Sequence, residues 1–248
     1  MSRWKAASLH LLISVFIAIT VGSLIYFVWY PSPYFQVSNG SNLMLLLMCV
    51  DVAIGPLLTL VVFKVGKKGL RFDLAVIAIL QILAFCYGIH VIAEARPVFV
   101  VAEDDRFVVV AANQLEDKDL AEAKQPEFAK RVWTGPQLVG VTPPPKGSQE
   151  SSDLIIPALK GKDVDELPKY YVPYAQVADQ LLARAKPLAM LIKQQPQRSE
   201  VIERFIARSG AAAADLVFIP LQGRQDDYTM VLSTRTKQPL AVLAIDPW

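Results

Sequence analysis

Residues 43–63 of the chain read LMLLLMCVDVAIGPLLTLVVF and contain a single charged side chain, that of Asp51. An α-helix rises about 1.5 Å per residue, so about 20 apolar residues are needed to cross the ~30 Å hydrocarbon core of a bilayer. This segment is long enough and apolar enough to do so. It therefore predicts a transmembrane helix, which is interrupted by a Gly55-Pro56 step.

Two further segments have the same character, at about residues 8–30 and 72–93. No Asp, Glu, Lys or Arg occurs between Lys5 and Asp51. Charged residues make up 19% of the chain and the mean hydropathy is +0.35, whereas soluble domains carry about 25% charge. This pattern excludes an ordinary soluble globule. The first apolar run is longer than the core of a secretory signal and no A-x-A cleavage site follows it, so we interpret it as a retained anchor.

The positive charges indicate how the three spans are oriented. The N-terminal tail carries Arg3 and Lys5, and the loop after the second span carries four cations, whereas residues 31–42 carry no charge. By the positive-inside rule the tail and the second loop are cytoplasmic, and three crossings bring the residues after Arg96 to the other side. We therefore expect a bacterial inner-membrane protein with a cytoplasmic N-terminus and a periplasmic C-terminal domain. The expected aromatic belt at the outer face consists of Trp29, Tyr30, Tyr34 and Phe35.

The chain is thus predicted to have two domains. Residues 1–96 form a three-helix membrane anchor, and residues 97–248 form one α+β domain with antiparallel strands. About 150 residues are enough for a domain with a sizeable core. This second region contains 18 Lys and Arg, 20 Asp and Glu, and no cysteine. We therefore expect no disulfide in it, and no nucleic-acid partner.

Local patterns predict the elements of the second domain. β-branched runs bounded by turn residues indicate strands, and apolar residues at helical spacing indicate helices. In chain order we expect a hairpin at 98–102 and 107–111, a short helix at 113–124, a loop at 142–152, a helix at 175–185 that restarts at Pro187, a helix with Ser199 as N-cap and Gly210 as C-cap, and an antiparallel meander at 216–221, 228–234 and 240–245.

The chain offers few groups for catalysis. Its two histidines, His10 and His90, fall near opposite ends of the membrane spans, so they cannot share a haem and leave the second domain without an imidazole. No zinc, Walker, dinucleotide or EF-hand motif occurs. The acidic run at residues 103–105 either binds calcium or forms a solvated hairpin turn, and we favour the turn. We predict no metal, no cofactor and no enzymatic activity.

The main candidate functional residues lie in the second span. Asp51 carries a carboxylate into the bilayer, which costs at least ~2.5 kcal/mol unless the group faces the bundle and finds a partner. Gln81 or His90 of the third span is a possible donor to it. The hydroxyl of Thr59 can donate a hydrogen bond to a backbone carbonyl that Pro56, which has no N–H, leaves without a donor. Asp51 is therefore either part of a proton or ion path, or a structural or partner-binding group. A single carboxylate cannot form a proton relay, so we favour the second alternative.

Five short strings occur in a characteristic order and spacing. They are Tyr30-Pro31, the run VDVAIGPLLTL at residues 50–60, Arg96-Pro97-Val98-Phe99, Asp105-Arg106-Phe107 and the closing LAIDPW at residues 243–248. Together they resemble the TfpX/TfpZ family of type IV pilin accessory proteins. The resemblance covers the spans and the hairpin by motif, and the rest of the second domain by layout.

The resemblance implies an inner-membrane protein that assists the assembly of type IV pili, with the major pilin as its client and the inner-membrane assembly machinery as a further partner. Before assembly, a pilin subunit is held in the membrane by a hydrophobic N-terminal helix and has a periplasmic head. It could therefore contact both domains of this chain. The strings contain Arg96, Asp105 and Arg106. These residues join the other candidate partner-binding residues, Asp51, Gly55, Pro56, Thr59 and Gln81.

Two other functions compete with this one. A membrane sensor with a ligand-binding periplasmic domain lacks a visible output, because the cytoplasmic parts are a short tail and the loop of residues 64–71. A membrane enzyme that uses Asp51 lacks a second catalytic group. The sequence therefore favours a non-enzymatic accessory protein or chaperone.

The charge pattern generates a topology prediction. A reporter that is active only in the periplasm is expected to be active when fused after Trp248 and silent when fused at Lys67, because the cations of the second loop hold that loop in the cytoplasm. Reporter activity in cells that carry each fusion measures this, and the reverse pattern contradicts the predicted orientation.

Overall fold

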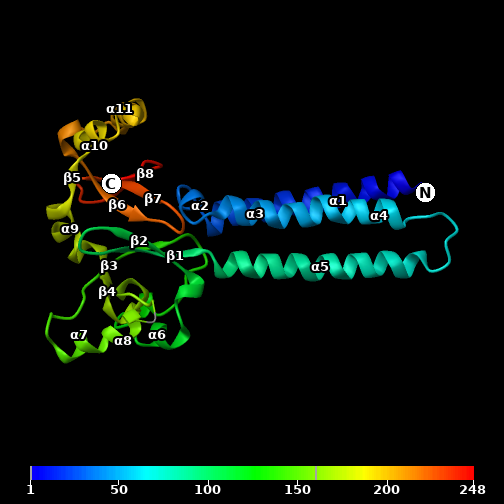
Figure 1. The fold of residues 1–248 in the computed structure, drawn as a ribbon, viewed down its shortest axis with the longest axis horizontal. Coiled ribbons are helices and arrows are strands. Elements are labelled where there is room, and N and C mark those ends of the chain that lie inside the picture. Colours follow the sequence, from blue (N-terminus) through cyan, green and yellow to red (C-terminus); the bar gives the residue numbers. More distant parts are fainter. Residues whose placement is uncertain (1, 160) are drawn as a thin grey trace. The chain divides into compact units, whose positions relative to one another are not determined.

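A computed structural model describes residues 2–159 and 161–248. The chain divides into two compact units, residues 1–96 and residues 97–248. The first unit is helical and the second contains a sheet with helices (Figure 1). Each unit has its own hydrophobic clusters.

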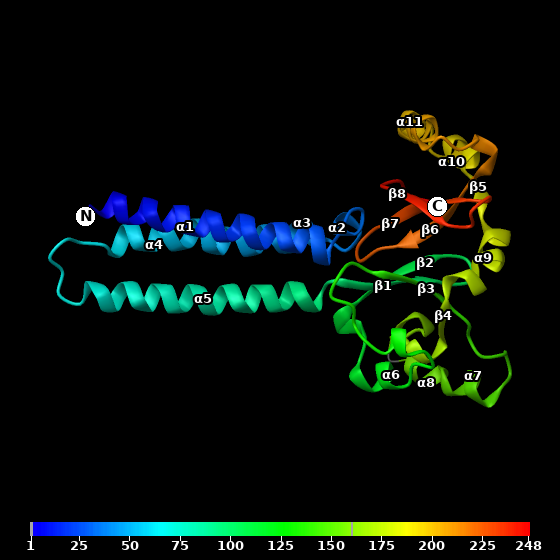
Figure 2. The ribbon, with the colours of Figure 1, turned by 180° about the vertical axis from the view of Figure 1, so that it is seen from behind.

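Three helices of the first unit are long and apolar enough to cross a membrane, which confirms the prediction of three spans. They run side by side in both views (Figures 1 and 2). The second span begins at Gly40, three residues earlier than expected, after a short α2 (Tyr34–Val37). The first span consists of α1 (Arg3–Leu24) and a π-helical turn at Ile25–Trp29. The second consists of α3 (Gly40–Met48), a π-helical turn at Cys49–Ile54 and α4 (Gly55–Val62). The third is α5 (Leu70–Glu94).

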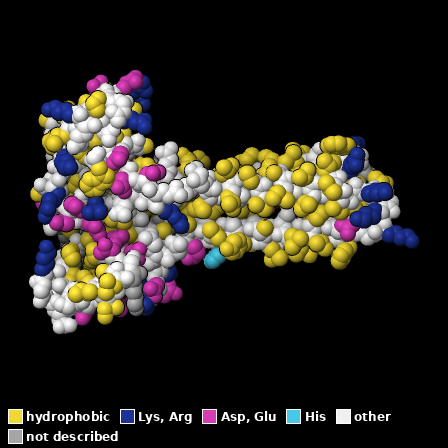
Figure 3. Space-filling view, viewed as in Figure 1, with side chains coloured by type: hydrophobic (Ala, Val, Ile, Leu, Met, Phe, Trp, Pro, Cys, Tyr) yellow, Lys and Arg dark blue, Asp and Glu magenta, His cyan; other side chains and the backbone are white. Residues whose placement is uncertain are grey.

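The surface of the helical unit is apolar along most of its length. Large hydrophobic side chains such as Phe16, Leu46 and Leu83 are exposed on all three spans. Lys and Arg gather at the end that holds the N-terminus and the loop between α4 and α5 (Figure 3). An apolar surface with cations at one end is what a membrane-spanning bundle requires.

Tyr30 lies at the opposite end of the bundle, and it corrects the expected aromatic belt. Its side chain is fully buried and packs with Ile25, Leu47 and Ile92. The Tyr30 hydroxyl donates to the carbonyl oxygen of Ile92 at 2.8 Å. Tyr30 therefore joins the first span to the third, whereas Tyr26 and Phe27 are exposed on this part of the first span. A buried tyrosine needs such a partner for its hydroxyl.

The second unit is built on one sheet, which has eight strands within the described residues, in the order β4-β3-β1-β2-β6-β7-β8, with β5 paired to β6. The predicted hairpin and meander are both present. The strands are β1 (Pro97–Ala102), β2 (Phe107–Ala111), β3 (Gln137–Val141), β4 (Tyr171–Pro173), β5 (Lys186–Pro187), β6 (Leu216–Gln222), β7 (Asp227–Ser233) and β8 (Pro239–Leu243).

The expected antiparallel pairs are present, and the sheet also contains two parallel pairs, so it is mixed. After β2, residues 112–136 carry the chain to the free edge of β1, where β3 pairs with β1 in parallel. On the other side of the hairpin, β6 pairs in parallel with β2. Parallel neighbours require a long connection between them. The hairpin is therefore the centre of the sheet, and the meander extends it on one side.

The helices of this unit differ from the prediction in detail. The expected helix at 113–124 is reduced to α6 (Asp117–Ala121), and the expected loop contains α7 (Gln149–Asp153). Ser199 begins its helix but does not cap it, because Arg198 occupies the N-cap position without a side-chain hydrogen bond. Gly210 ends it in the left-handed region, as predicted, with φ of 66°. The remaining helices are α8 (Ile155–Leu159), α9 (Ala178–Arg184), α10 (Leu188–Gln194) and α11 (Ser199–Ser209).

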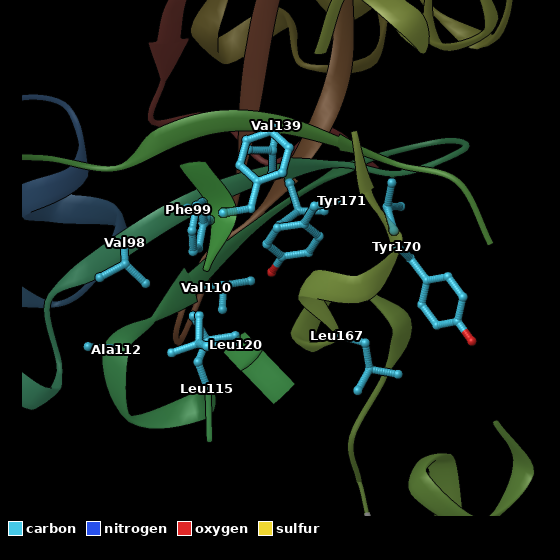
Figure 4. Packing of buried hydrophobic residues seen from close by; sticks show 13 residues of the cluster. Val98, Phe99, Val110, Ala112, Leu115, Leu120, Val139, Leu167, Tyr170 and Tyr171 are labelled. Atoms are coloured by element: carbon cyan, nitrogen blue, oxygen red, sulfur yellow. The ribbon is translucent and has the colours of Figure 1, made fainter. Parts of the chain in front are cut away.

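Two clusters of buried residues hold this unit together. The first lies against β1, β2 and β3 and is drawn in Figure 4. Phe99 is fully buried at its centre, with its ring centroid 5.1 Å from that of Tyr171 and 6.5 Å from that of Phe128. The second cluster joins α10 and α11 to β6, β7 and β8. Both clusters are internal to residues 97–248.

This packing predicts that residues 97–248 fold without the spans, into a domain whose circular dichroism shows mixed helix and strand and is unchanged by reductant. Within that fragment, Phe99→Ala is expected to lower the free energy of unfolding by about 3–5 kcal/mol, because it leaves a cavity in the first cluster. Urea denaturation measures the loss. Leu240→Ala, at an exposed position of β8, is the control and should cost about 0.5 kcal/mol or less. A random-coil fragment, or equal losses for both variants, would contradict the prediction.

Candidate functional site

Asp51 lies in the π-helical turn in the middle of the second span. Its side chain is buried, with 9% of the residue exposed. Its Oδ2 atom accepts no hydrogen bond from any residue that the structure describes. The turn is wide because Pro56 follows it, and proline cannot donate a backbone N–H to the preceding turn. Turns of this kind are frequent at functional sites.

Gly55 brings the third span close to the second at the same level. A Cβ atom at Gly55 would overlap the side-chain amide of Gln81, so glycine is the residue that lets this amide lie against the helix backbone. The Oε1 atom of Gln81 also lacks a donor among the described residues. Gln81 was expected to donate to Asp51, but its amide packs on Gly55. The other expected donor, His90, is exposed.

Thr59 lies one turn further along the second span and contacts the first span. Its hydroxyl and the Nδ1 atom of His10 are 2.7 Å apart and form a hydrogen bond. Thr59 was expected to turn its hydroxyl to a backbone carbonyl freed by Pro56. In the structure this hydroxyl instead forms a hydrogen bond with the imidazole of His10, which belongs to another helix. This is a polar contact between spans, of the kind that stabilises membrane bundles.

Asp51, Gln81 and His10 line one cavity of the helical unit. The cavity has a volume of about 260 Å³ and is lined by α1, by the second span and by α5. Most of its wall is aliphatic. Four polar side chains line it, those of His10, Ser14, Asp51 and Gln81. A cavity that is largely apolar with a few polar groups is the usual form of a binding site.

Of the eight candidate residues, Asp51 and Gln81 line this cavity, and the other six, Gly55, Pro56, Thr59, Arg96, Asp105 and Arg106, do not. Arg96 is buried and donates to the carbonyl oxygen of Ala93, where α5 ends. Asp105 and Arg106 form an exposed ion pair in the β1–β2 turn, with 3.0 Å between Oδ1 and Nε. Next to them, Asp104 accepts hydrogen bonds from two residues of α9. The geometry gives these residues structural roles in a helix end and a hairpin turn.

The comparison with known proteins identifies the family. A family model described as "Fimbrial assembly protein FimB" matches residues 1–39, which include His10 of the cavity. Two proteins of Dichelobacter nodosus, the fimbrial assembly proteins of serogroups I and E1, are each 29% identical to the chain over 245 residues, which cover 98% of the chain and 95% of each relative. A third protein of the same bacterium, the fimbrial assembly protein of serogroups C1 and C2, is 36% identical over 121 residues, which are 48% of this chain and 92% of that protein.

The chain belongs to the FimB family of fimbrial assembly proteins. No solved structure matches it. The family name concerns assembly and says nothing of a catalysed reaction.

One residue of the acidic run 103–105 belongs to a larger acidic group that the local sequence did not predict. Glu103, at the end of β1, lies near Asp165 and Asp163, which come sixty residues later in the chain. Burial, followed by the charges of these two carboxylates, raises the pKa of Glu103 from 4.5 to about 7. Burial and neighbouring acids likewise raise the pKa of Asp165 to about 6. Within the described residues, no three His, Cys, Asp or Glu side chains are arranged as metal ligands.

This acidic group predicts a pH dependence of stability. Between pH 4.5 and about 7 the folded protein keeps a proton on Glu103 that the unfolded chain releases, so the free energy of unfolding falls as pH rises through that window. Glu103→Gln keeps the shape and removes this titration. We expect the variant to melt at a higher temperature than the wild type above pH 7, and at the same temperature near pH 4.5. Part of the pH dependence will remain, because Asp165 contributes with the same sign.

Thermal melts of the 97–248 fragment at several pH values test this. Glu127→Gln, at an exposed position, is the matched control and should melt as the wild type does at every pH. A Glu103→Gln variant that is less stable than the wild type above pH 7 would show that Glu103 is held as a stabilising carboxylate.

Proposed function

We infer that this chain is an inner-membrane accessory protein that assists the assembly of type IV fimbriae without catalysing a reaction. Membership of the FimB family supports a role in fimbrial assembly. The five sequence strings that resemble the TfpX/TfpZ proteins support the finer assignment to pilin accessory proteins, with the major pilin as client. The three apolar spans support a location in the membrane.

The distribution of charge supports the orientation. The Lys and Arg residues of the helical unit gather at the end formed by the N-terminus and the α4–α5 loop (Figure 3). We therefore place that end in the cytoplasm and residues 97–248 in the periplasm. A client held in the same membrane by a helix, with its head in the periplasm, is accessible to both units of this protein.

The buried carboxyl group of Asp51 carries the proposal. An intramembrane acid is costly to keep and is therefore a functional group by default. Asp51 is the single acid on the wall of the cavity, and its Oδ2 atom has no donor in the described part of the chain. The other titratable side chain on this wall, His10, forms its hydrogen bond with Thr59 and none with Asp51 in the described residues, so the two are not linked as a proton relay. An oxygen without a donor at a cavity instead suits contact with a polar group of a client.

The experiment is complementation of a strain that lacks the gene. Loss of surface fimbriae in that strain, with normal transcription of the pilin gene, and their return with the wild-type protein are the expected results. Surface fimbriae are counted by electron microscopy and by shearing. A deletion strain with normal fimbriae would contradict the proposed function.

Substitutions of Asp51 in the same strain test how it acts. Asp51→Asn keeps the hydrogen-bonding ability of the side chain and removes its charge, whereas Asp51→Leu removes both. Hydrogen bonds within membranes are worth about 0.6–2 kcal/mol, so contact predicts near-normal fimbriae for Asn and a clear loss for Leu at equal protein levels. Ala53→Leu, at an exposed position of the same turn, is the control and should behave as the wild type. If Asn and Leu fail equally, the charge of Asp51 is required and a proton-coupled or enzymatic role replaces contact.

A further inference from the structure

The cavity at Asp51 is bounded on one side by two helices that hardly meet. The first and third spans each pack against the second span, but within the described residues the backbones of α1 and α5 scarcely approach each other. The cavity wall includes Ile13 and Ile17 of α1, and Ala78 and Ile82 of α5. All four of these side chains have exposed surface. The cavity is therefore a groove with an apolar rim between α1 and α5.

The groove is long as well as open. Its lining on the first span extends from His10 to Ile25. At about 1.5 Å per residue this is about 22 Å, or most of the ~30 Å thickness of the hydrocarbon core. The side chains of Ser14 and Ala18 on this wall are small, which allows the backbone of another helix to come close. The groove thus has the length and the shallow wall that suit an elongated occupant.

The floor of the groove is polar at mid-depth. One oxygen atom there, Oδ2 of Asp51, has no hydrogen-bond donor among the described residues. The side chain of Asp51 is buried, and a hydrocarbon environment supplies no water to hydrate it. An occupant that leaves this oxygen unpaired gains little. The occupant that fits carries a hydrogen-bond donor or a positive charge at the level of Asp51.

We propose that the groove between α1 and α5 binds one membrane-spanning helix of the assembly client, and that this helix presents a hydrogen-bond donor or a cation to Asp51. The inference rests on the proposed function and names the contact through which it operates. A lipid acyl chain matches the apolar rim but has no donor at mid-depth. A helix meets both requirements, because its aliphatic face covers the rim and one polar side chain reaches the floor.

Photo-crosslinking in native membranes tests this proposal. A benzophenone amino acid is placed in the full-length chain at Ala78 or Ile82, both on the groove wall, or at Ala84, which is exposed on the same helix but does not line the groove. The client is the major pilin of the same bacterium, expressed at its normal level. We expect a light-dependent adduct at Ala78 and Ile82 whose peptide comes from the membrane helix of the pilin, and little adduct at Ala84.

The same crosslinker combined with Asp51→Leu measures the polar contact. Loss of one intramembrane hydrogen bond corresponds to a fall of about 3- to 30-fold in binding, so the adduct at Ala78 should fall at least about threefold while Ala53→Leu leaves it unchanged. Adducts to lipid alone or to a second copy of this chain overturn the proposal, as do equal adducts at Ala84 or adducts insensitive to Asp51→Leu. If these outcomes occur while the deletion strain still lacks fimbriae, the proposed function stands and the groove is not its contact site.

Discussion

The carboxyl group of Asp51 constrains the whole helical unit, because a bilayer offers it no water and its own helix offers it no donor. Placing such a group at mid-membrane costs at least ~2.5 kcal/mol if it stays unpaired. Neighbouring residues change the helix geometry and the packing at the level of Asp51. Pro56 and the π-helical turn widen the helix at this level, and Gly55 admits the amide of Gln81. The result is a cavity with polar groups at mid-depth, in a unit whose surface is apolar along most of its length.

The second unit is stabilised in a different way. It has no cysteine, so its stability depends on two hydrophobic clusters and on the central hairpin that joins them. The hairpin pairs with strands from both halves of the unit, β3 on one side and β6 on the other. Burial and the neighbouring carboxylates raise the pKa of Glu103 to about 7 and that of Asp165 to about 6, so the stability of this unit depends on pH.

Much of this arrangement could be predicted from the sequence. Long runs without charge predict spans, and alternating β-branched runs beside turn residues predict the hairpin and the meander, because these signals are local. The parallel partners of the hairpin were missed because β3 and β6 come far along the chain from the strands that they pair with. The contact between His10 and Thr59 was missed for the same reason, since 49 residues separate them. The burial of Tyr30 was missed because its partner is a backbone carbonyl, which has no signature in sequence.

Chemical labelling of Asp51 tests the central claim directly. A hydrophobic carbodiimide enters the bilayer and couples to carboxyl groups that are free within it, and mass spectrometry of the peptide that contains Asp51 reports the product. The account predicts labelling of Asp51 in membranes without the client and protection of Asp51 when the client is present. An Asp51 that is not labelled in membranes without the client would contradict an unpaired carboxyl group at an open groove.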